Sequence, residues 1–370
     1  PTLGEILQQH GRRLVSGGSG SPGTTYLTNP TLTGPVINWA VAWPEAFQEE
    51  VTRRYGGLLS QETSSVERNR FVIAALRDLL IPVQRPDVVT LWLTEPDHAQ
   101  HYHGLLSAEA CAMLRHVDAE VEALVAHLAA TQPDPLTVFV LSDHGFDTIG
   151  PDASLKQALV EAGLKAAPDS SDIVVASCSV YFNEKARPRL GRVARWLLAQ
   201  PWVSGVFVRD DLLDGAWGAL PQSAVGGGHA RSAELMYSYR WTHDDNAKGV
   251  SGMVYGRSGL IATHGSTSPY ALQNVLVAWG QGIKTRTVSN VPCGIVDVAP
   301  TVLRLLGIEP PPTMDGRVLD EILESGPPPE SLSVARQMRL AEADGHRQTA
   351  HYQTMGANRY LDWVDRDQVH

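Results

Sequence analysis

Cysteine, basic residues and long apolar runs are all scarce in this 370-residue sequence. The three cysteines, Cys111, Cys178 and Cys293, lie far apart and form no CxxC pair, which excludes a disulfide framework and a thiolate zinc site. Acidic residues outnumber basic ones by 40 to 30, so the net charge of -10 argues against a nucleic-acid polymer as a partner. No apolar run approaches the ~20 residues of a membrane span, and we expect no membrane-spanning helix.

Two further signatures are absent. The glycine-rich segment 16–23 matches neither the dinucleotide GxGxxG pattern nor the P-loop pattern, and we interpret it as a flexible loop. The chain starts at Pro1, and no charged segment followed by an apolar core precedes Leu3, so there is no signal peptide in this sequence. We expect the chain to begin inside a larger protein.

Two apolar runs, 88–93 and 136–142, are typical of strands buried on both faces of a parallel sheet. Between them, residues 107–130 form the clearest predicted helix, which begins with a Ser107 cap and ends before Pro133. Cys111 falls on the apolar stripe of this helix, so we interpret it as a core residue. Strand, helix and strand make a βαβ unit, and the predicted fold class is α/β with a parallel-sheet core.

The domain organisation is predicted to be discontinuous. Residues 1–150 and 263–323 form the α/β core, residues 151–262 form an inserted α+β cap, and the proline-rich residues 324–370 form a tail that wraps over the surface. Other expected elements are listed by range: helices at 2–14, 45–59, 66–80 (ended by Pro82 and Pro86), 192–198 and 298–306 (capped by Asp297), and strands at 173–176, 180–182, 206–208, 234–241 and 274–279.

The loop after the strand 88–93 contains Asp97 and His101, four residues apart. If the chain turns helically after Pro96, these side chains lie on one face and can share an ion. Carboxylate and imidazole together suit zinc. Taken alone, such a pair is more often a surface pair than a metal site.

Two more clusters follow the same pattern. Asp143 and His144 come directly after the strand 136–142, and Gly145 is expected to permit a tight turn there. His264 stands beside a glycine ahead of the strand 274–279, where a lone histidine is more often a hydrogen-bonded loop residue. Because the carboxyl ends of parallel strands collect reactive groups, three clusters together favour a metal site.

These pieces resemble the nucleotide pyrophosphatase/phosphodiesterase group of the alkaline phosphatase superfamily. The resemblance implies an alkaline phosphatase-like parallel-sheet core with an inserted α+β cap. The resemblance covers nearly the whole chain, and its matching segments are Glu95-Pro96-Asp97 with His101 and Gly104, Ser142-Asp143-His144-Gly145, Thr263-His264-Gly265, Val296–Gly307 and Met314-Asp315-Gly316. The first two segments are fairly specific to the superfamily, whereas the Val296–Gly307 segment is structural.

Residue by residue, the resemblance implies that Asp97, His101 and His264 bind one zinc ion and that Asp143 and His144 bind a second. It also implies that a Thr or Ser nucleophile attacks phosphorus in line and that water then hydrolyses the covalent intermediate. Two ions about 4 Å apart suit this reaction because they clamp the attacking and leaving oxygens. Ligation by neutral histidine and ionised aspartate favours activity at neutral to alkaline pH.

The chain departs from the family pattern in two places. Gln100 stands where the family usually has glycine. More seriously, no counterpart of the nucleophile, or of the strand-end aspartate that completes the second zinc site, occurs in this chain. No strand-end aspartate precedes the hydroxyl residues near the start of the chain, which disfavours them as substitutes: Ser16, Ser19, Thr24 and Thr25. We expect the nucleophile on a segment upstream of Pro1, lost or supplied as a separate N-terminal fragment.

The predicted function is therefore zinc-dependent hydrolysis of phosphodiester or pyrophosphate bonds in a small, nucleotide-like phosphoester, by an enzyme of which this chain alone is inactive. Trp92 is a candidate for stacking on a nucleobase, although a packing role in the strand is equally open. Phosphomonoesterase and phosphonate hydrolase activities stay open, as does a non-catalytic relative with a degenerate site. Sulfatase activity is disfavoured because the CxPxR motif is absent. The resemblance alone suggests a periplasmic or secreted protein.

Overall fold

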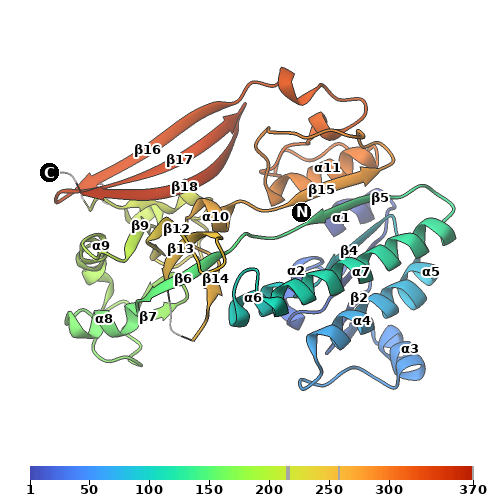
Figure 1. The fold of residues 1–370 in the computed structure, drawn as a ribbon, viewed down its shortest axis with the longest axis horizontal. Coiled ribbons are helices and arrows are strands. Elements are labelled where there is room, and N and C mark those ends of the chain that lie inside the picture. The colour runs from blue at the N-terminus through green and yellow to red at the C-terminus, as the bar shows by residue number, and fades with distance from the viewer. Residues whose placement is uncertain (214–216, 257–258, 369–370) are drawn as a thin grey trace. The chain divides into compact units, whose positions relative to one another are not determined.

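The computed structural model describes residues 1–213, 217–256 and 259–368 (Figure 1). These residues divide into two compact units. The first unit comprises residues 1–138, 278–287 and 294–326, and the second comprises residues 139–277, 288–293 and 327–370. The domain boundaries expected from the sequence stay a prediction.

The first unit contains a four-stranded sheet of order β3-β2-β1-β4, in which β1 is parallel to both β2 and β4. Its strands are β1 (Leu14–Gly18), β2 (Val36–Asn38), β3 (Ala42–Trp43) and β4 (Val88–Trp92). Its helices are α1 (Leu3–Gln9), α2 (Pro22–Leu27), α3 (Glu45–Tyr55), α4 (Ser65–Ala75), α5 (Ile81–Gln84), α6 (Asp97–His103), α7 (Ala108–Thr131) and α11 (Val298–Leu305). The predicted parallel α/β sheet is confirmed in this unit.

The interpretation of segment 16–23 as a flexible loop is wrong, because its first half is the interior of the sheet. Ser16 is fully buried in β1, and a Cβ on Gly17 would lie 2.5 Å from Leu76 Cδ1. The glycine therefore allows close approach of the helix layer rather than chain mobility. The second half starts α2, which Ser21 caps by accepting the Thr24 N–H.

Pro82 does not end the helical stretch as predicted. A π-helical segment, Leu76–Leu80, follows α4 and leads into α5, in which Pro82 lies in the first turn. The missing N–H of proline costs little there, and the stretch ends instead at Arg85, whose φ of 45° is left-handed.

The burial predicted for the βαβ unit is also wrong. Val140 and Leu141 of β5 (Thr137–Leu141) are 40% and 38% exposed, and Leu114 on the α7 stripe is 56% exposed, while Cys111 is only half-buried. Within the described chain, β5 pairs only with β15 (Leu276–Gly280) and β4 belongs to a different sheet, so neither strand has the two neighbours of a central strand.

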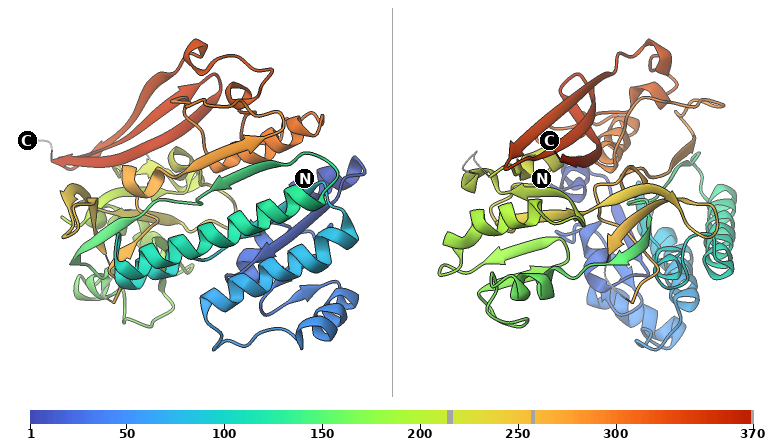
Figure 2. Two further views of the ribbon diagram at one scale, coloured as in Figure 1. Left: turned by 45° about the vertical axis from the view of Figure 1, so that its right-hand side comes forward. Right: turned by 60° about the vertical axis from the view of Figure 1, so that its left-hand side comes forward.

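The second unit is built from antiparallel and mixed sheets. Five strands are ordered β10-β9-β11-β8-β7, four are ordered β12-β13-β6-β14, and β16-β17-β18 form a twisted three-stranded ribbon (Figure 2). The strands are β6 (Asp147–Asp152), β7 (Ile173–Ala176), β8 (Ser179–Phe182), β9 (Val203–Val208), β10 (Leu220–Pro221), β11 (Leu235–Tyr239), β12 (Trp241–Asp245), β13 (Ser251–Gly256), β14 (Ala262–Thr263), β16 (Ala335–Ala343), β17 (His346–Met355) and β18 (Asn358–Gln368), with helices α8 (Leu155–Glu161), α9 (Leu190–Leu198) and α10 (Pro269–Leu272). Most of the tail that was expected to wrap over the surface therefore forms the three-stranded sheet β16-β17-β18.

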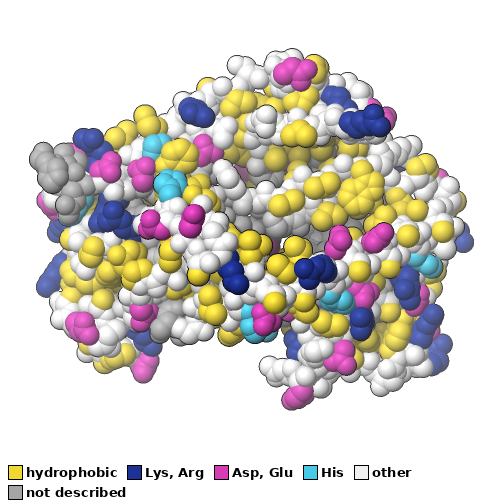
Figure 3. Space-filling model, viewed as in Figure 1, with side chains coloured by type: hydrophobic (Ala, Val, Ile, Leu, Met, Phe, Trp, Pro, Cys, Tyr) yellow, Lys and Arg dark blue, Asp and Glu magenta, His cyan; other side chains and the backbone are white. Residues whose placement is uncertain are grey.

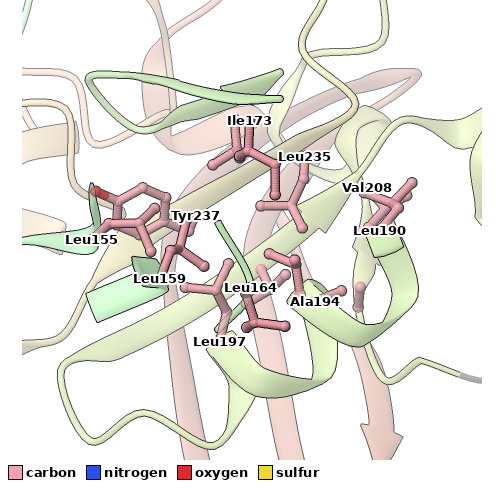
Figure 4. Close-up of a cluster of buried hydrophobic side chains, with 14 of the residues drawn as sticks. Leu155, Leu159, Leu164, Ile173, Leu190, Ala194, Leu197, Val208, Leu235 and Tyr237 are labelled. Carbon is pink, nitrogen blue, oxygen red and sulfur yellow. The ribbon is translucent and has the colours of Figure 1, made fainter. Parts of the chain in front are cut away.

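The core of the second unit lies where α8 and α9 cover the five-stranded sheet. Leu159, Leu197 and Leu235 are fully buried there and point toward one another (Figure 4). On the face drawn in Figure 3, acidic, basic and apolar side chains of the described residues are interspersed. No helix in the described ranges has both the length and the apolar character needed to cross a membrane.

An ion-pair cluster around the buried Lys165 joins Arg189, the residue before α9, to the rest of the second unit. The Lys165 ammonium group, 1% exposed, donates to the Ile173 carbonyl and lies 3.5 Å from the Asp172 carboxylate, which also accepts from Arg189 at 2.8 Å. Burial alone would raise the pKa of the Asp172 carboxyl, but hydrogen bonds from Ser170 and Arg189 outweigh it and hold that pKa well below its usual range.

This cluster predicts an acid-dependent stability. A carboxyl whose pKa is lower in the folded state stabilises the fold above its unfolded pKa of about 3.9, and the stabilisation is lost as pH falls below that value. The free energy of unfolding should therefore drop by up to about 1.4 kcal/mol per pH unit through this one group. Urea unfolding of the wild type and Asp172→Asn at about pH 5.5 and about pH 3 measures the difference. Equal pH slopes in the two proteins would contradict the assignment.

Candidate metal centre

The first predicted ligand pair lies in the first unit, directly after β4. Asp97 is the first residue of α6, and one helical turn later His101 faces it, with 3.5 Å between Asp97 Oδ1 and His101 Nε2. The two side chains are 34% and 17% exposed. The spacing of four residues therefore does bring the carboxylate and the imidazole together, as helix geometry requires.

A buried carboxylate holds this loop in place. The Glu95 side chain is 2% exposed, and it accepts a hydrogen bond from the Ala99 N–H at 3.1 Å. That N–H is among the first of α6 that have no partner within the helix. The Thr94 N–H donates to Ser19 Oγ at 3.0 Å, so the loop after β4 is also tied to the loop after β1.

The second pair lies in the second unit, after β5. Ser142 Oγ accepts from the Val275 N–H at 3.0 Å, just beyond the ends of the paired strands β5 and β15. Asp143 Oδ1 and His144 Nε2 are 3.5 Å apart. Gly145 is needed for close approach and not for a left-handed turn, because an added Cβ would lie 2.0 Å from the Tyr270 carbonyl oxygen.

His264, which follows β14, lies against His144. The two rings are stacked, with centroids 3.6 Å apart and an interplanar angle of 16°, and Phe146 packs against both at 5.4 Å. His144 Nδ1 lies 3.0 Å from the Gly145 carbonyl oxygen. The tautomer that donates from Nδ1 carries its lone pair on Nε2, which is the arrangement of a metal-binding histidine.

These distances fit a zinc ion. Two ligand atoms at about 2.0–2.1 Å from a tetrahedral ion lie about 3.3 Å apart. Both carboxylate–imidazole pairs have a separation of 3.5 Å. The assignment of the five ligands nevertheless stays a prediction, because a carboxylate contacts a histidine at this spacing without a metal as well.

The remaining sequence-predicted residues have ordinary structural surroundings. Trp92 is the half-buried last residue of β4, and its carbonyl accepts from the Ser19 N–H. The four hydroxyl residues disfavoured as nucleophiles all make hydrogen bonds within the first unit: Ser16 with Thr90, Ser19 with Thr94, Thr24 with Ser21, and Thr25 with Asn38.

One buried hydrogen-bonded cluster was not predicted from the sequence. Asp147, Ser266 and Ser268 form a buried hydrogen-bonded cluster beside His144 and His264. The only signal was the spacing of the two serines, which places their side chains on the same face of an extended segment. A lone aspartate at the start of a strand gave no reason to expect burial.

Comparisons with known proteins identify a family match and a shared fold for this chain. A sequence model described as "Type I phosphodiesterase / nucleotide pyrophosphatase" matches residues 8–197. The ectonucleotide pyrophosphatase/phosphodiesterase family member 1 proteins of Mus musculus and Rattus norvegicus are 36% identical over 85 residues, which is 22% of this chain and 9% of theirs. The match thus spans less than a tenth of the length of these curated relatives.

Solved structures show the same fold. Human ectonucleotide pyrophosphatase/phosphodiesterase 5 superposes with a TM-score of 0.58 at 16% identity, covering 87% of this chain and 74% of that one. The murine protein 5, in an inactive form in complex with AMP, gives a TM-score of 0.54 at 15% identity, covering 84% and 71%. The fold is therefore alkaline phosphatase-like.

The loop geometry predicts the effect of removing the buried Glu95 carboxylate. Glu95→Ala leaves the Ala99 N–H without its acceptor and should lower the free energy of unfolding by about 1–3 kcal/mol. Glu95→Gln retains a carbonyl acceptor and should cost less. Urea unfolding measures both, with exposed Glu109→Ala in the first turn of α7 as the control. An Ala variant as stable as the control would show that this hydrogen bond does not hold the loop.

Proposed function

Because this chain belongs to the type I phosphodiesterase/nucleotide pyrophosphatase family of the alkaline phosphatase superfamily, we propose that it carries the metal ligands of an enzyme that hydrolyses phosphodiester or pyrophosphate bonds with zinc. The observation that carries the proposal is the recurrence of one arrangement. A carboxylate and an imidazole, 3.5 Å apart, follow directly after β4 and again after β5. Such pairs at strand ends are suited to a dinuclear phosphoryl-transfer site.

We assign Asp97, His101 and His264 to one zinc ion, and Asp143 and His144 to the other. Oxygen and nitrogen donors of this kind are the ligands zinc takes in catalytic sites. Bound zinc neutralises charge on the phosphoryl oxygens and lowers the pKa of an attacking hydroxyl group. The second ion has only two ligands in this assignment, so a further donor must complete its coordination.

We further propose that the nucleophile is a Thr or Ser that these 370 residues do not supply. The hydroxyl groups of Ser16, Ser19 and Thr25 support this, because each is buried and engaged in a hydrogen bond. The strands support it as well. Within the described chain β4 is an edge strand of its sheet. The backbone N–H and C=O groups along the outer side of an edge strand provide a place for a further strand to pair.

The proposed substrate is a small nucleotide-like phosphoester. One structural neighbour is in complex with AMP. The mixed surface and net charge of -10 are compatible with a small anion held by metal ions and unfavourable for a polymeric nucleic acid. Trp92, at the end of β4 and five residues before Asp97, is our candidate for contact with a base.

Ligand substitution tests the assignment. In the full-length protein, Asp97→Ala, His101→Ala and His264→Ala should each lower hydrolysis of an aryl phosphodiester by at least about 100-fold, since losing even an outer partner of a ligand costs 10–100-fold. His103→Ala, at the exposed end of the same helix as Asp97 and His101, is the matched control and should retain activity. Activity that persists in any of the three ligand variants would remove that residue from the site.

Metal content separates the enzyme from a degenerate relative. We expect the full-length protein to contain close to two zinc ions, to lose activity on chelation and to regain it with added zinc. The 370-residue chain alone should turn over poorly or not at all. Elemental analysis and the same aryl phosphodiester assay measure both. One ion or none in the full-length protein would favour a non-catalytic relative, and robust turnover by the 370-residue chain of verified mass would refute an external nucleophile.

A further inference from the structure

The second unit contains a buried carboxylate that the proposed ligand set does not use. Asp147, the first residue of β6, is 0% exposed, and its two oxygens accept hydrogen bonds from the hydroxyls of Ser266 and Ser268, each at 2.5 Å. Burial raises the pKa of the Asp147 carboxyl, and the two serines offset part of that rise. Burying a carboxylate costs free energy, so a carboxylate at this position indicates a structural or functional role.

Asp147 connects the two segments that carry the stacked histidines. It lies three residues after His144, and Ser266 lies two residues after His264. The backbone at Asp147 also pairs with Thr263 in the antiparallel contact of β6 and β14. The carboxylate therefore adds a side-chain link to a short backbone ladder, next to both imidazoles.

Ser268 links this cluster to α10 and, through α10, to Gly145. Ser268 Oγ also accepts the Ala271 N–H, which caps α10. The Ala271 carbonyl in turn accepts the Gly145 N–H at 2.8 Å, and Gly145 has no room for a side chain. The chain from Asp147 through Ser268 and α10 thus returns to the residue beside His144.

The hydrogen-bond roles explain why the central group is a carboxylate. Ser266 Oγ accepts the Ser268 N–H and Ser268 Oγ accepts the Ala271 N–H, so each hydroxyl proton is directed at Asp147. The two hydroxyls donate to different oxygens of Asp147, and asparagine would replace one of these acceptors with an NH2 donor. Asp147→Asn is therefore a disruptive change despite its matching shape.

We propose that Asp147, with Ser266 and Ser268, is a positioning group that holds the His144 and His264 rings in the relative orientation needed for metal binding. This rests on the proposed function in one respect, namely that the two histidines bind zinc. Asp147 is fully buried and is not one of the assigned ligands. It acts by fixing the two loops before the zinc ions bind, which reduces the ordering that binding requires.

The test uses the full chain, with zinc alone as the probe. Asp147→Asn and the milder Ser266→Ala should each weaken zinc binding by about 10–100-fold, measured by chelator competition. In the metal-free proteins, histidine NMR should show shifts confined to the His144 and His264 signals, which His→Gln variants assign. Asp172→Asn removes a half-buried carboxylate of the same unit and should change the thermal stability without moving either readout.

The outcomes distinguish this inference from the proposed function. If zinc affinity and both histidine signals are unchanged in Asp147→Asn and Ser266→Ala, the positioning role is overturned while the zinc site stands. If the wild type binds no zinc but the two histidine signals still shift, the positioning role is supported and the proposed function fails. Should Asp147→Asn not fold, Ser266→Ala decides, since it removes one hydroxyl with its two hydrogen bonds and leaves the carboxylate and Ser268 in place. Equal effects in Asp172→Asn would reduce the role to general stability and overturn it.

Discussion

A buried carboxylate that is not itself a predicted ligand lies close in sequence to each predicted ligand pair. Glu95 accepts a backbone N–H of α6 beside Asp97 and His101, and Asp147 accepts two serine hydroxyls beside His144. Taking a carboxylate out of water costs several kcal/mol unless hydrogen bonds compensate. Both groups have that compensation, so the loops that follow the strands are held by hydrogen bonds of defined direction and not by apolar packing alone.

This arrangement is consistent with the demands of a metal site. Ligand atoms must stay within a few tenths of an ångström of their positions for an ion to bind tightly, and loops are otherwise the most mobile part of a fold. In the first unit the loop after β4 is tied through Thr94 to the loop after β1. In the second unit, α10 and Gly145 complete the connection around His144. Each unit therefore holds its own ligand loop with a separate set of hydrogen bonds.

Much of the fold was accessible from the sequence, because local pattern determines it. The helix 107–130 and the strands that flank it were predicted to within a residue or two at each end. Segment 16–23 was misinterpreted because its glycines are common to loops and to strands under close packing, and only Leu76 lying over Gly17 distinguishes the two. The exposure of Val140 and Leu141 could not be predicted either, since an apolar run does not report how many neighbouring strands it has.

The sequence by itself determined the composition of the candidate site. Asp97 and His101 meet because they are one helical turn apart, and Asp143 and His144 because they are adjacent at a strand end, so in each pair the contact is local. Only the tertiary structure decided that His264 stacks on His144 and that Asp147 is buried between the segments carrying them. The hydrogen bonds responsible join residues 119 and 121 positions apart. No local spacing encodes such a contact, because it exists only when β6 and β14 have paired.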